Sequence, residues 1–253
     1  MTVESQQDLE GILRAGRVVA IVRDAMLQAI EPGITTAELD EIGAKLLEHQ
    51  GAKSAPRVTY NFPGATCISV NEEAAHGIPG PRKIEAGDIV NVDVSAELNG
   101  YFADTGGTVV VPPRATVKSR LCRATQLALE HALAEVRAGA PINRIGKAIE
   151  RTAESHHFKV IKNLAGHGIG RSLHEEPTGI VSYFDRRDTR RLQLGQVLAI
   201  EPFLSTQSSH VREAQDGWTL VGHPANLSAQ FEHTVIVTRG APIVATLAET
   251  ASC

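Results

Sequence analysis

The sequence predicts one α/β domain made of two similar halves, about residues 1–112 and 113–253. Three observations support this prediction: helical and strand-like segments alternate along the 253 residues, a long β-hairpin closes the first half, and several motifs of the first half recur in the second. The hydrophobic content of 42% is ordinary for a globular chain of this length, which is long enough to bury a sizeable core.

The first half opens with two predicted helices. Residues 7–30 carry apolar side chains at helical spacing, and in the next helix Thr35 and Glu38 have the spacing of a capping box. Strand-like segments follow until Pro112-Pro113 interrupts the pattern. Helices resume near Thr116, at the start of the second half.

The β-hairpin is encoded by residues 89–96 and 101–111. Apolar and polar residues alternate with period two in the first segment, and Asn99-Gly100 is a strong signal for a two-residue turn. In the register that this turn favours, Leu98 pairs with Tyr101. That register decides which residues of the two strands face each other.

The register of the hairpin places two carboxylates on one of its faces, with Asp104 opposite Ser95 and Asp93 as the diagonal neighbour of Asp104. The Cβ atoms of such neighbours are roughly 7 Å apart, so both carboxylates can share a cation or a pair of cations. Because two acids this close repel each other, a positive ion is expected to hold them. Gly106 and Gly107 leave little bulk beside the acids, which is typical of a strand that a ligand or another backbone approaches closely.

The second half repeats motifs of the first. Residues 87–93 recur as residues 195–201, each ending in an acid, and His76-Gly77-Ile78 recurs as His167-Gly168-Ile169. The offset is close to half of the chain, so we expect one pseudo-symmetric domain with a central seam rather than two independent domains. The seam is the expected place for a site.

The repeat also supplies counterparts for the two aspartates. If the halves face each other, Glu201 ends a strand opposite Asp93, and Glu232 parallels Asp104 within its own strand. His167, between two glycines, offers an imidazole. Four carboxylates and one nitrogen suit Mn, Fe(II), Co or Zn in a two-metal site better than a cysteine-rich zinc site. Two divalent cations would also neutralise the four carboxylates.

The net charge, the distribution of apolar residues and the number of cysteines exclude several classes of protein. A formal net charge of −4 gives no basic surface for nucleic acid. The first residues lack the apolar core of a signal peptide, and no run approaches the ~18 apolar residues of a membrane span. The cysteines, Cys67, Cys122 and Cys253, are odd in number and widely spaced, as expected for reduced thiols. A cytoplasmic protein without a membrane partner is therefore expected, and we expect it to be a monomer.

Six ordered motifs resemble those of the bacterial type I methionine aminopeptidases over nearly the whole chain: AHGIPG, NVDV, DTGGT, AGHGIGRSLHEEP, AIEPF and SAQFEHT. The resemblance implies the pita-bread fold, in which two α/β halves around a central antiparallel sheet enclose a dinuclear metal centre. It implies that Asp104 and Glu232 bridge the metals. The full ligand set that it implies is Asp93, Asp104, His167, Glu201 and Glu232.

The chemistry expected of such a centre is peptide hydrolysis. Two metal ions lower the pKa of a shared water toward ~7, and the bridging hydroxide is the expected nucleophile on the carbonyl of an N-terminal methionine. Glu201 would take up and return the proton. The resemblance implies that His174 contacts the carbonyl oxygen, that His76 orients the scissile amide, and that one metal binds the substrate α-amine. Otherwise His174 would be a surface histidine and His76 an ordinary turn histidine.

The family also places a methionine pocket around Phe62, Cys67 and Trp218, with His76 at its edge. This chain departs from the commonest bacterial pattern at three positions that would change the shape of the pocket: Pro56, Thr59 and Leu173. In relatives, a monovalent cation is held at positions that correspond here to Asn71, Glu73 and Ser228.

The implied substrates are N-terminal methionyl peptides and nascent chains whose second residue is small, with only transient proximity to the ribosome. A proline-specific peptidase of the same fold is the first alternative, but such enzymes usually carry a large additional N-terminal domain, and only a short segment precedes the pocket residues here. The second alternative is a pita-bread protein that binds protein or RNA without catalysis. That alternative requires lost ligands, and all five are present.

Overall fold

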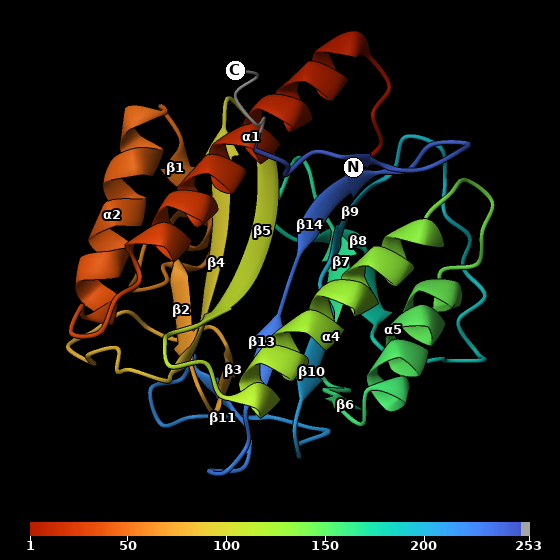
Figure 1. The fold of residues 1–253 in the computed structure, drawn as a ribbon. Helices are drawn as coiled ribbons and strands as arrows, with labels where there is room; N and C mark the ends of the chain where they lie inside the picture. Colours follow the sequence, from red (N-terminus) through yellow and green to blue (C-terminus); the bar gives the residue numbers. More distant parts are fainter. Residues whose placement is uncertain (249–253) are drawn as a thin grey trace, which may run out of the picture.

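The structure is a computed structural model that describes residues 1–248 (Figure 1). Its helices are α1 (Gln6–Ala29), α2 (Thr36–His49), α3 (Ala55–Tyr60), α4 (Thr116–Ala134) and α5 (Asn143–Ser155). The earlier strands are β1 (Lys53–Ser54), β2 (Cys67–Val70), β3 (Glu73–Ala75), β4 (Ile89–Leu98) and β5 (Tyr101–Val110). The later strands are β6 (Lys159–Val160), β7 (Ala165–Gly168), β8 (Glu175–Val181), β9 (Val197–Ile200), β10 (Phe203–Ser205), β11 (Arg212–Glu213), β12 (Leu220–Val221), β13 (Ser228–Gln230), β14 (His233–Ile236) and β15 (Ile243–Val244).

The first helices and the hairpin follow the prediction from sequence. Helix α1 matches the predicted range 7–30 to within one residue at each end. Thr35 and Glu38 form both hydrogen bonds of the capping box at the start of α2. Strands β4 and β5 pair with Leu98 opposite Tyr101, so the predicted register is confirmed.

Antiparallel pairing builds a sheet in each half of the chain. Strand β4 pairs with β1, β2 and β5 in a 4-stranded sheet. The order β15-β14-β9-β7-β8 forms a 5-stranded sheet from the second half. Smaller sheets have the orders β13-β10-β6 and β11-β12-β3. In Figure 1, α1 lies against β4 and β5, and α4 and α5 lie side by side over the second half.

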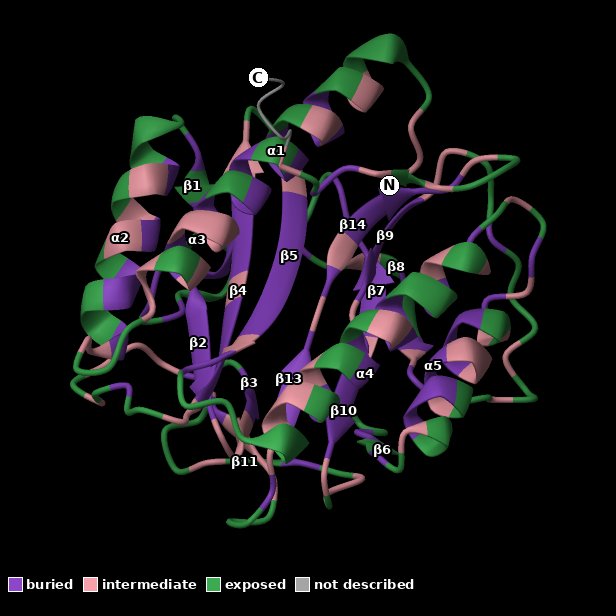
Figure 2. Cartoon of the chain, viewed as in Figure 1, coloured by how far each residue is buried: buried purple, intermediate pink, exposed green. Residues whose placement is uncertain are grey.

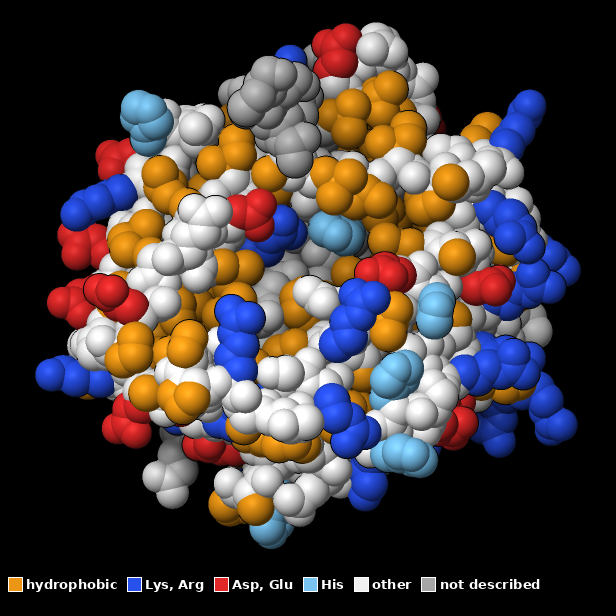
Figure 3. Space-filling model, viewed as in Figure 1, with side chains coloured by type: hydrophobic (Ala, Val, Ile, Leu, Met, Phe, Trp, Pro, Cys, Tyr) orange, Lys and Arg blue, Asp and Glu red, His pale blue; other side chains and the backbone are white. Residues whose placement is uncertain are grey.

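Two large apolar cores lie beneath the helices, and Figure 2 shows the buried strands and helix faces that form them. The first joins Ile12 of α1 and Leu39 of α2 to Val92 of β4. The second joins Leu121 of α4 to Leu198 of β9. Charged side chains of both signs are spread over the outer face of the helices (Figure 3). None of the helices within residues 1–248 is long and apolar enough to cross a bilayer.

Threonine hydroxyls join the hairpin to the strands of the second half. Thr234 Oγ1 accepts from the Asp104 N–H at 2.9 Å and donates to the Asp104 carbonyl at 2.8 Å. Thr105 Oγ1 donates to the Glu232 carbonyl at 2.9 Å, and the Glu232 N–H donates to the Gly106 carbonyl at 3.0 Å. The seam therefore fixes the backbone of Asp104 and of Glu232 independently of any bound ion.

The two glycines of the hairpin are explained by this close approach. A Cβ atom at Gly106 would overlap the side chain of Gln230 from the other half. At Gly107 a Cβ atom would lie 3.0 Å from Leu27 Cδ1 of α1. Protein side chains, from Gln230 and Leu27, therefore occupy the space that a Cβ atom at either glycine would need.

The structure differs from the predicted pattern in two places. Residues 55–60 form α3, within a stretch for which strands are predicted. Ser54 caps this helix by accepting from the Arg57 N–H at 3.4 Å, and Asn61 ends it with a φ of 57°. Glu232 lies in the break between β13 and β14 rather than within a strand, because its N–H donates across the seam to the hairpin.

Candidate metal and substrate site

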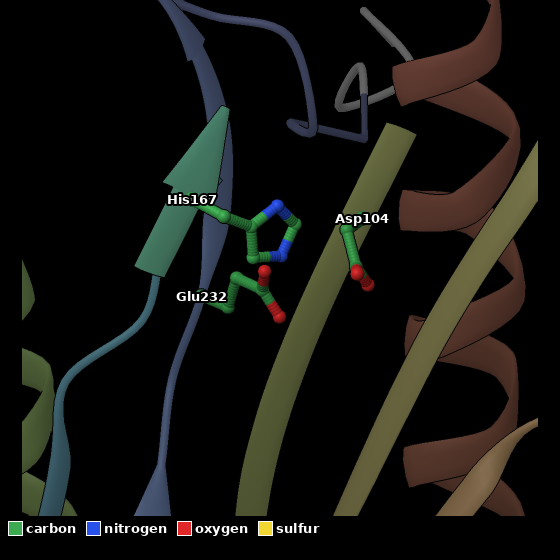
Figure 4. Close-up of side chains that lie close together, drawn as sticks. All are labelled: Asp104, His167 and Glu232. Atoms are coloured by element: carbon green, nitrogen blue, oxygen red, sulfur yellow. The ribbon is translucent and has the colours of Figure 1, made fainter. Parts of the chain in front are cut away.

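Three buried side chains from both halves meet at the seam: Asp104 of β5, His167 of β7 and Glu232 from the β13–β14 break. One nitrogen or oxygen atom of each lies within 4.8 Å of those of the other two. Figure 4 shows the side chains of His167 and Glu232 extending toward the strand that carries Asp104. Carboxylate oxygens with an imidazole nitrogen are suitable donors for divalent transition metals.

His167 presents a bare ring nitrogen to this cluster. Its Nδ1 lies 2.9 Å from the Gly168 carbonyl oxygen, which can only accept, so Nδ1 carries the ring proton. Burial, helped by the neighbouring His174, lowers the pKa of His167 to about 4. The ring is therefore neutral at pH 7. Its Nε2 lone pair lies 3.5 Å from Glu201 Oε1, an arrangement of two acceptors that a cation would stabilise.

The two other predicted ligands, Asp93 and Glu201, lie beside the cluster and line a cavity together with Asp104 and His167. Asp93 is on β4, one diagonal step from Asp104 as predicted, and Glu201 directly follows β9. Burial raises the pKa of Asp93 well above its ordinary value, and repulsion from Asp104 and Glu201 raises it further. The structure thus brings all five predicted ligands to one place.

The metal-free cluster is electrostatically unfavourable. Burial is the largest cause that raises the pKa values of Asp104, Glu201 and Glu232, and neighbouring carboxylates add to it at Glu201 and Glu232. Within residues 1–248, the buried side-chain oxygens that lack a hydrogen-bond partner are Asp104 Oδ1 and Glu232 Oε1. Such orphaned acceptors are rare and costly. Divalent cations would satisfy both oxygens and neutralise the charge, so these residues fit a metal centre.

The metal-free protein is expected to lose stability as the pH rises from 7 to 8.5. Asp93, Glu201 and Glu232 have folded pKa values well above the reference values of 3.8 for Asp and 4.5 for Glu, whereas the pKa of Asp104 is raised only to about 6, so Asp104 has largely lost its proton before this window begins. Their contribution to stability is therefore complete below those reference values and is lost as the pH rises through the folded values. Each proton that only the folded state retains lowers the free energy of unfolding by about 1.4 kcal/mol per pH unit.

Thermal melting between pH 7 and 8.5 measures this effect. In this window the histidines with lowered pKa values, such as His167, are neutral in both states, so their stabilising contribution is already complete. The window ends below the ordinary thiol pKa of 9.0. Burial raises the pKa values of Cys67 and Cys122, so these thiols would also lower the free energy of unfolding as the pH rises above 9.0. Protein loaded with Mn²⁺ is the control and should show a smaller slope. Equal slopes with and without metal would contradict the prediction.

Asp104 and His167 of the cluster, together with Asp93 and Glu201, line a cavity of about 290 Å³. The predicted substrate-contacting residues all line it: Phe62, Cys67, His76, His174 and Trp218. The rings of Phe62 and Trp218 meet edge to face with centroids 5.1 Å apart. The cavity therefore places an aromatic wall beside the acid cluster.

The two predicted substrate histidines reach the cavity from different halves. His76 follows β3 with a φ of 55°, an uncommon conformation for a residue with a Cβ atom, of the kind that functional sites often retain. His174 precedes β8, and its ring centroid lies 4.0 Å from that of His167. Burial lowers the pKa values of His76 and His174, so both rings are neutral at pH 7.

Glu175 holds the loop that carries His174. Its Oε1 accepts from the N–H groups of Arg171 at 2.5 Å and Ser172 at 2.6 Å, and its Oε2 pairs with the Met1 amino group. This carboxylate points into the loop and is outside the cavity lining. The sequence HEEP therefore contributes a histidine to the cavity and a structural acid to the loop.

The residues expected to hold a monovalent cation do not line the cavity. The Ser228 N–H donates to the Asn71 carbonyl at 3.1 Å. Glu73 forms an ion pair with Arg82 at 2.7 Å, and the Lys118 ammonium donates to Asn71 Oδ1 at 3.2 Å. A monovalent cation at these residues stays a prediction.

Helix α3 changes which residues shape the cavity. Pro56 and Leu173 line it, as expected for positions that depart from the family pattern. Thr59 is absent from the lining, and Tyr60 is present instead. The sequence pattern predicts strands in this stretch, so it does not identify Tyr60 as a cavity residue. Ser54 as a cap residue, with Pro56 in the first turn that follows, is the start signal of a helix and could locate it.

A buried carboxylate on α2 also escaped prediction. Asp40 accepts from the N–H groups of Ala65 at 3.0 Å and Thr66 at 2.8 Å, and from the Thr66 hydroxyl at 2.7 Å. These bonds hold the segment between Phe62 and Cys67, which carries part of the cavity wall. In the sequence, Asp40 is one more acid in an amphipathic helix.

Two buried carboxyl groups, two half-buried ones and one bare imidazole nitrogen lie together beside an aromatic-walled cavity, and they define the site of a metal-dependent enzyme. The sequence model of metallopeptidase family M24 matches residues 10–239. The chain belongs to this metallopeptidase family.

The chain is similar to several bacterial methionine aminopeptidases over nearly its whole length. It is 47% identical to the methionine aminopeptidase of Staphylococcus epidermidis, covering 97% of this chain and 98% of that protein. It is 46% identical to methionine aminopeptidase 2 of Bacillus subtilis, and the alignment covers 97% of this chain and 99% of that protein. The crystal structure of methionine aminopeptidase from Thermotoga maritima has a TM-score of 0.93 at 33% identity, covering 97% of this chain and 99% of that chain. The predicted pita-bread fold and the family resemblance are confirmed.

Proposed function

We propose that the chain removes methionine from the N-terminus of peptides and nascent proteins whose second residue is small. One observation carries the proposal: a buried acid–histidine cluster with orphaned oxygens shares a cavity with an aromatic wall. The full-length similarity to relatives named methionine aminopeptidase supports the choice of substrate.

The proposed ligands are the five residues that converge at the seam: Asp93, Asp104, His167, Glu201 and Glu232. We propose two divalent ions from the set Co, Mn, Fe(II) and Zn, because two such charges balance four carboxylates. Asp104 and Glu232 are the proposed bridging ligands. Support comes from their orphaned buried oxygens, which belong to opposite halves and meet at the seam.

Each remaining catalytic group has a proposed role in hydrolysis. When bound, the divalent ions supply a water of lowered pKa and polarise the scissile carbonyl. Glu201 takes the proton of the attacking water and returns it to the amine that leaves, a role supported by the raised pKa of its buried carboxyl. His174 donates a hydrogen bond to the carbonyl oxygen as negative charge develops there. His76 orients the scissile amide.

Phe62, Cys67 and Trp218 are the proposed contacts of the methionine side chain. The edge-to-face rings supply a rigid apolar surface, and a thioether interacts favourably with aromatic edges. Pro56 and Leu173 line the same cavity, so the departures from the commonest family pattern act on this subsite.

Release of methionine from Met-Ala-Ser and Met-Lys-Ser tests both the specificity and the metal requirement. After chelation and dialysis, Co²⁺, Mn²⁺, Fe²⁺ or Zn²⁺ is added back singly, and free methionine is measured. We expect no release in chelator, recovery with at least one ion, and turnover of Met-Ala-Ser about 100-fold faster than that of Met-Lys-Ser, the scale that steric rejection of a large side chain can reach.

Equal turnover of the two peptides would contradict the preference for a small second residue. Full activity in chelator would contradict the metal requirement. Leu-Ala-Ser serves as the matched substrate control, since it changes only the side chain that enters the proposed pocket and should react more slowly than Met-Ala-Ser.

We further propose a monomer that works in the cytoplasm, in transient proximity to ribosomes. Cys67 and Cys122 are free thiols, which supports a reducing compartment, and Cys253 lies outside the described residues. A monovalent cation near Asn71, Glu73 and Ser228 remains part of the proposal.

A further inference from the structure

The phenol of Tyr60 contacts the ring of His174 at the cavity wall. Tyr60 Oη lies 2.6 Å from His174 Nδ1, and the ring centroids are 5.5 Å apart at an interplanar angle of 49°. Both residues line the cavity. The pair is separated by 114 residues in sequence, so the fold creates this contact rather than local chain geometry.

The contact determines where the ring proton of His174 resides. A neutral imidazole has one N–H, and the partner of one ring nitrogen sets its position. A phenol is a good donor and a weak acceptor, because its oxygen lone pair is delocalised into the ring, whereas a bare imidazole nitrogen accepts well. With Tyr60 donating to Nδ1, the proton of His174 is on Nε2.

His167 has the opposite tautomer. Its Nδ1–H donates to the Gly168 carbonyl, so its Nε2 is bare. The rings of His167 and His174 are 4.0 Å apart, yet one offers a lone pair and the other an N–H. This difference matches the two roles proposed for them, since a ligand needs the lone pair and a carbonyl oxygen needs the donor.

We propose that Tyr60 is a positioning residue: its phenol holds His174 Nδ1 and thereby keeps the Nε2–H available as a donor within the cavity. The purpose of that donor rests on the proposed function. The tautomer of His174 is a property of the metal-free protein and does not depend on the proposed function. Tyr60 acts through His174 and does not itself contact the reacting atoms.

Nitrogen NMR of metal-free protein labelled with ¹⁵N-histidine tests the tautomer directly. Long-range ¹H–¹⁵N spectra distinguish the two neutral forms, and loss of signals in His174→Gln assigns the ring. We expect a single Nε2–H form in the wild type and a mixture of both forms in Tyr60→Phe. Tyr60 is 45% exposed, so removal of its hydroxyl should leave the fold intact. A single Nε2–H form in Tyr60→Phe would overturn the inference.

Kinetics of the metal-loaded protein supply the second readout. For Met-Ala-Ser, Tyr60→Phe should lower kcat about 10- to 100-fold, the range for loss of a partner that orients a histidine, with KM and metal content unchanged. The matched control is Tyr183→Phe, because the ring of Tyr183 packs beside Lys162, 5.3 Å from Nζ, outside the cavity lining. It should equal the wild type in both measurements.

The kinetic outcomes separate the inference from the proposed function. A wild-type kcat in Tyr60→Phe, or a raised KM with unchanged kcat, would assign Tyr60 to the cavity wall only and overturn its positioning role. If the wild type released no methionine, the proposed function would fail, while the tautomer spectra would still confirm or refute the role of the phenol.

Discussion

Asp104→Asn is expected to remove the metal ions and to lower kcat/KM for Met-Ala-Ser by roughly 10³-fold or more, since metal assistance contributes several kcal/mol to such hydrolyses. Asp104 lies at the seam with an orphaned buried oxygen, and one of its carboxylate oxygens lies within 4.8 Å of a possible ligand atom of His167 and of Glu232. Asparagine keeps the shape but loses the charge that balances the ions. Metal content by elemental analysis and methionine release measure the effect, and Glu232→Gln should behave in the same way.

The same substitution should stabilise the metal-free protein at pH 8. It removes one of the buried charges that repel one another, and the new amide can donate to a neighbouring carboxylate. A higher melting temperature together with lost metal would show that inactivity does not result from unfolding. Glu97→Gln is the matched control, because Glu97 lies on the same hairpin and pairs with Lys53 at 3.4 Å. Retention of both ions by Asp104→Asn would refute the bridging assignment.

The parts of the fold that follow local rules could be predicted from the sequence. The alternation in residues 89–96 and the Asn99-Gly100 turn determine the register of β4 and β5, and with it the position of Asp104 opposite Ser95. The internal repeat located Glu201 in the second half. The alternation and the turn lie within short segments, and the repeat compares two short segments with each other. These signals can therefore be read without knowledge of the tertiary structure. The division into halves near residue 112 stays a prediction.

The parts that depend on contacts between distant segments could not be predicted. Helix α3 is a short element whose cap and proline were outweighed by the surrounding strand pattern, and its formation brings Tyr60 instead of Thr59 to the cavity. The break at Glu232 results from a hydrogen bond to the other half. Asp40 looks like any polar helix residue until the loop at Thr66 folds onto it. In each case the partner is far away in sequence.

His174→Ala is expected to leave the metal ions bound and to lower kcat by about 10²- to 10³-fold, the usual cost of losing one donor to a developing oxyanion. The ring lies outside the three-residue cluster of Asp104, His167 and Glu232. KM should change little, because a donor that acts as charge develops stabilises the transition state more than the bound substrate. Steady-state kinetics and elemental analysis measure both effects. His210→Ala is the matched control, since His210 is an exposed loop residue beside Ser209.

A double variant decides whether Tyr60 and His174 act as one unit. If the phenol works only through the imidazole, adding Tyr60→Phe to His174→Ala should cause no further loss of kcat, whereas independent contributions would multiply. Loss of metal in His174→Ala would contradict the assigned role and would mean that stacking on His167, at a centroid distance of 4.0 Å, supports the ligand itself. Retained metal, reduced kcat and a non-additive double variant together would show that the hydroxyl of Tyr60 affects kcat only through His174.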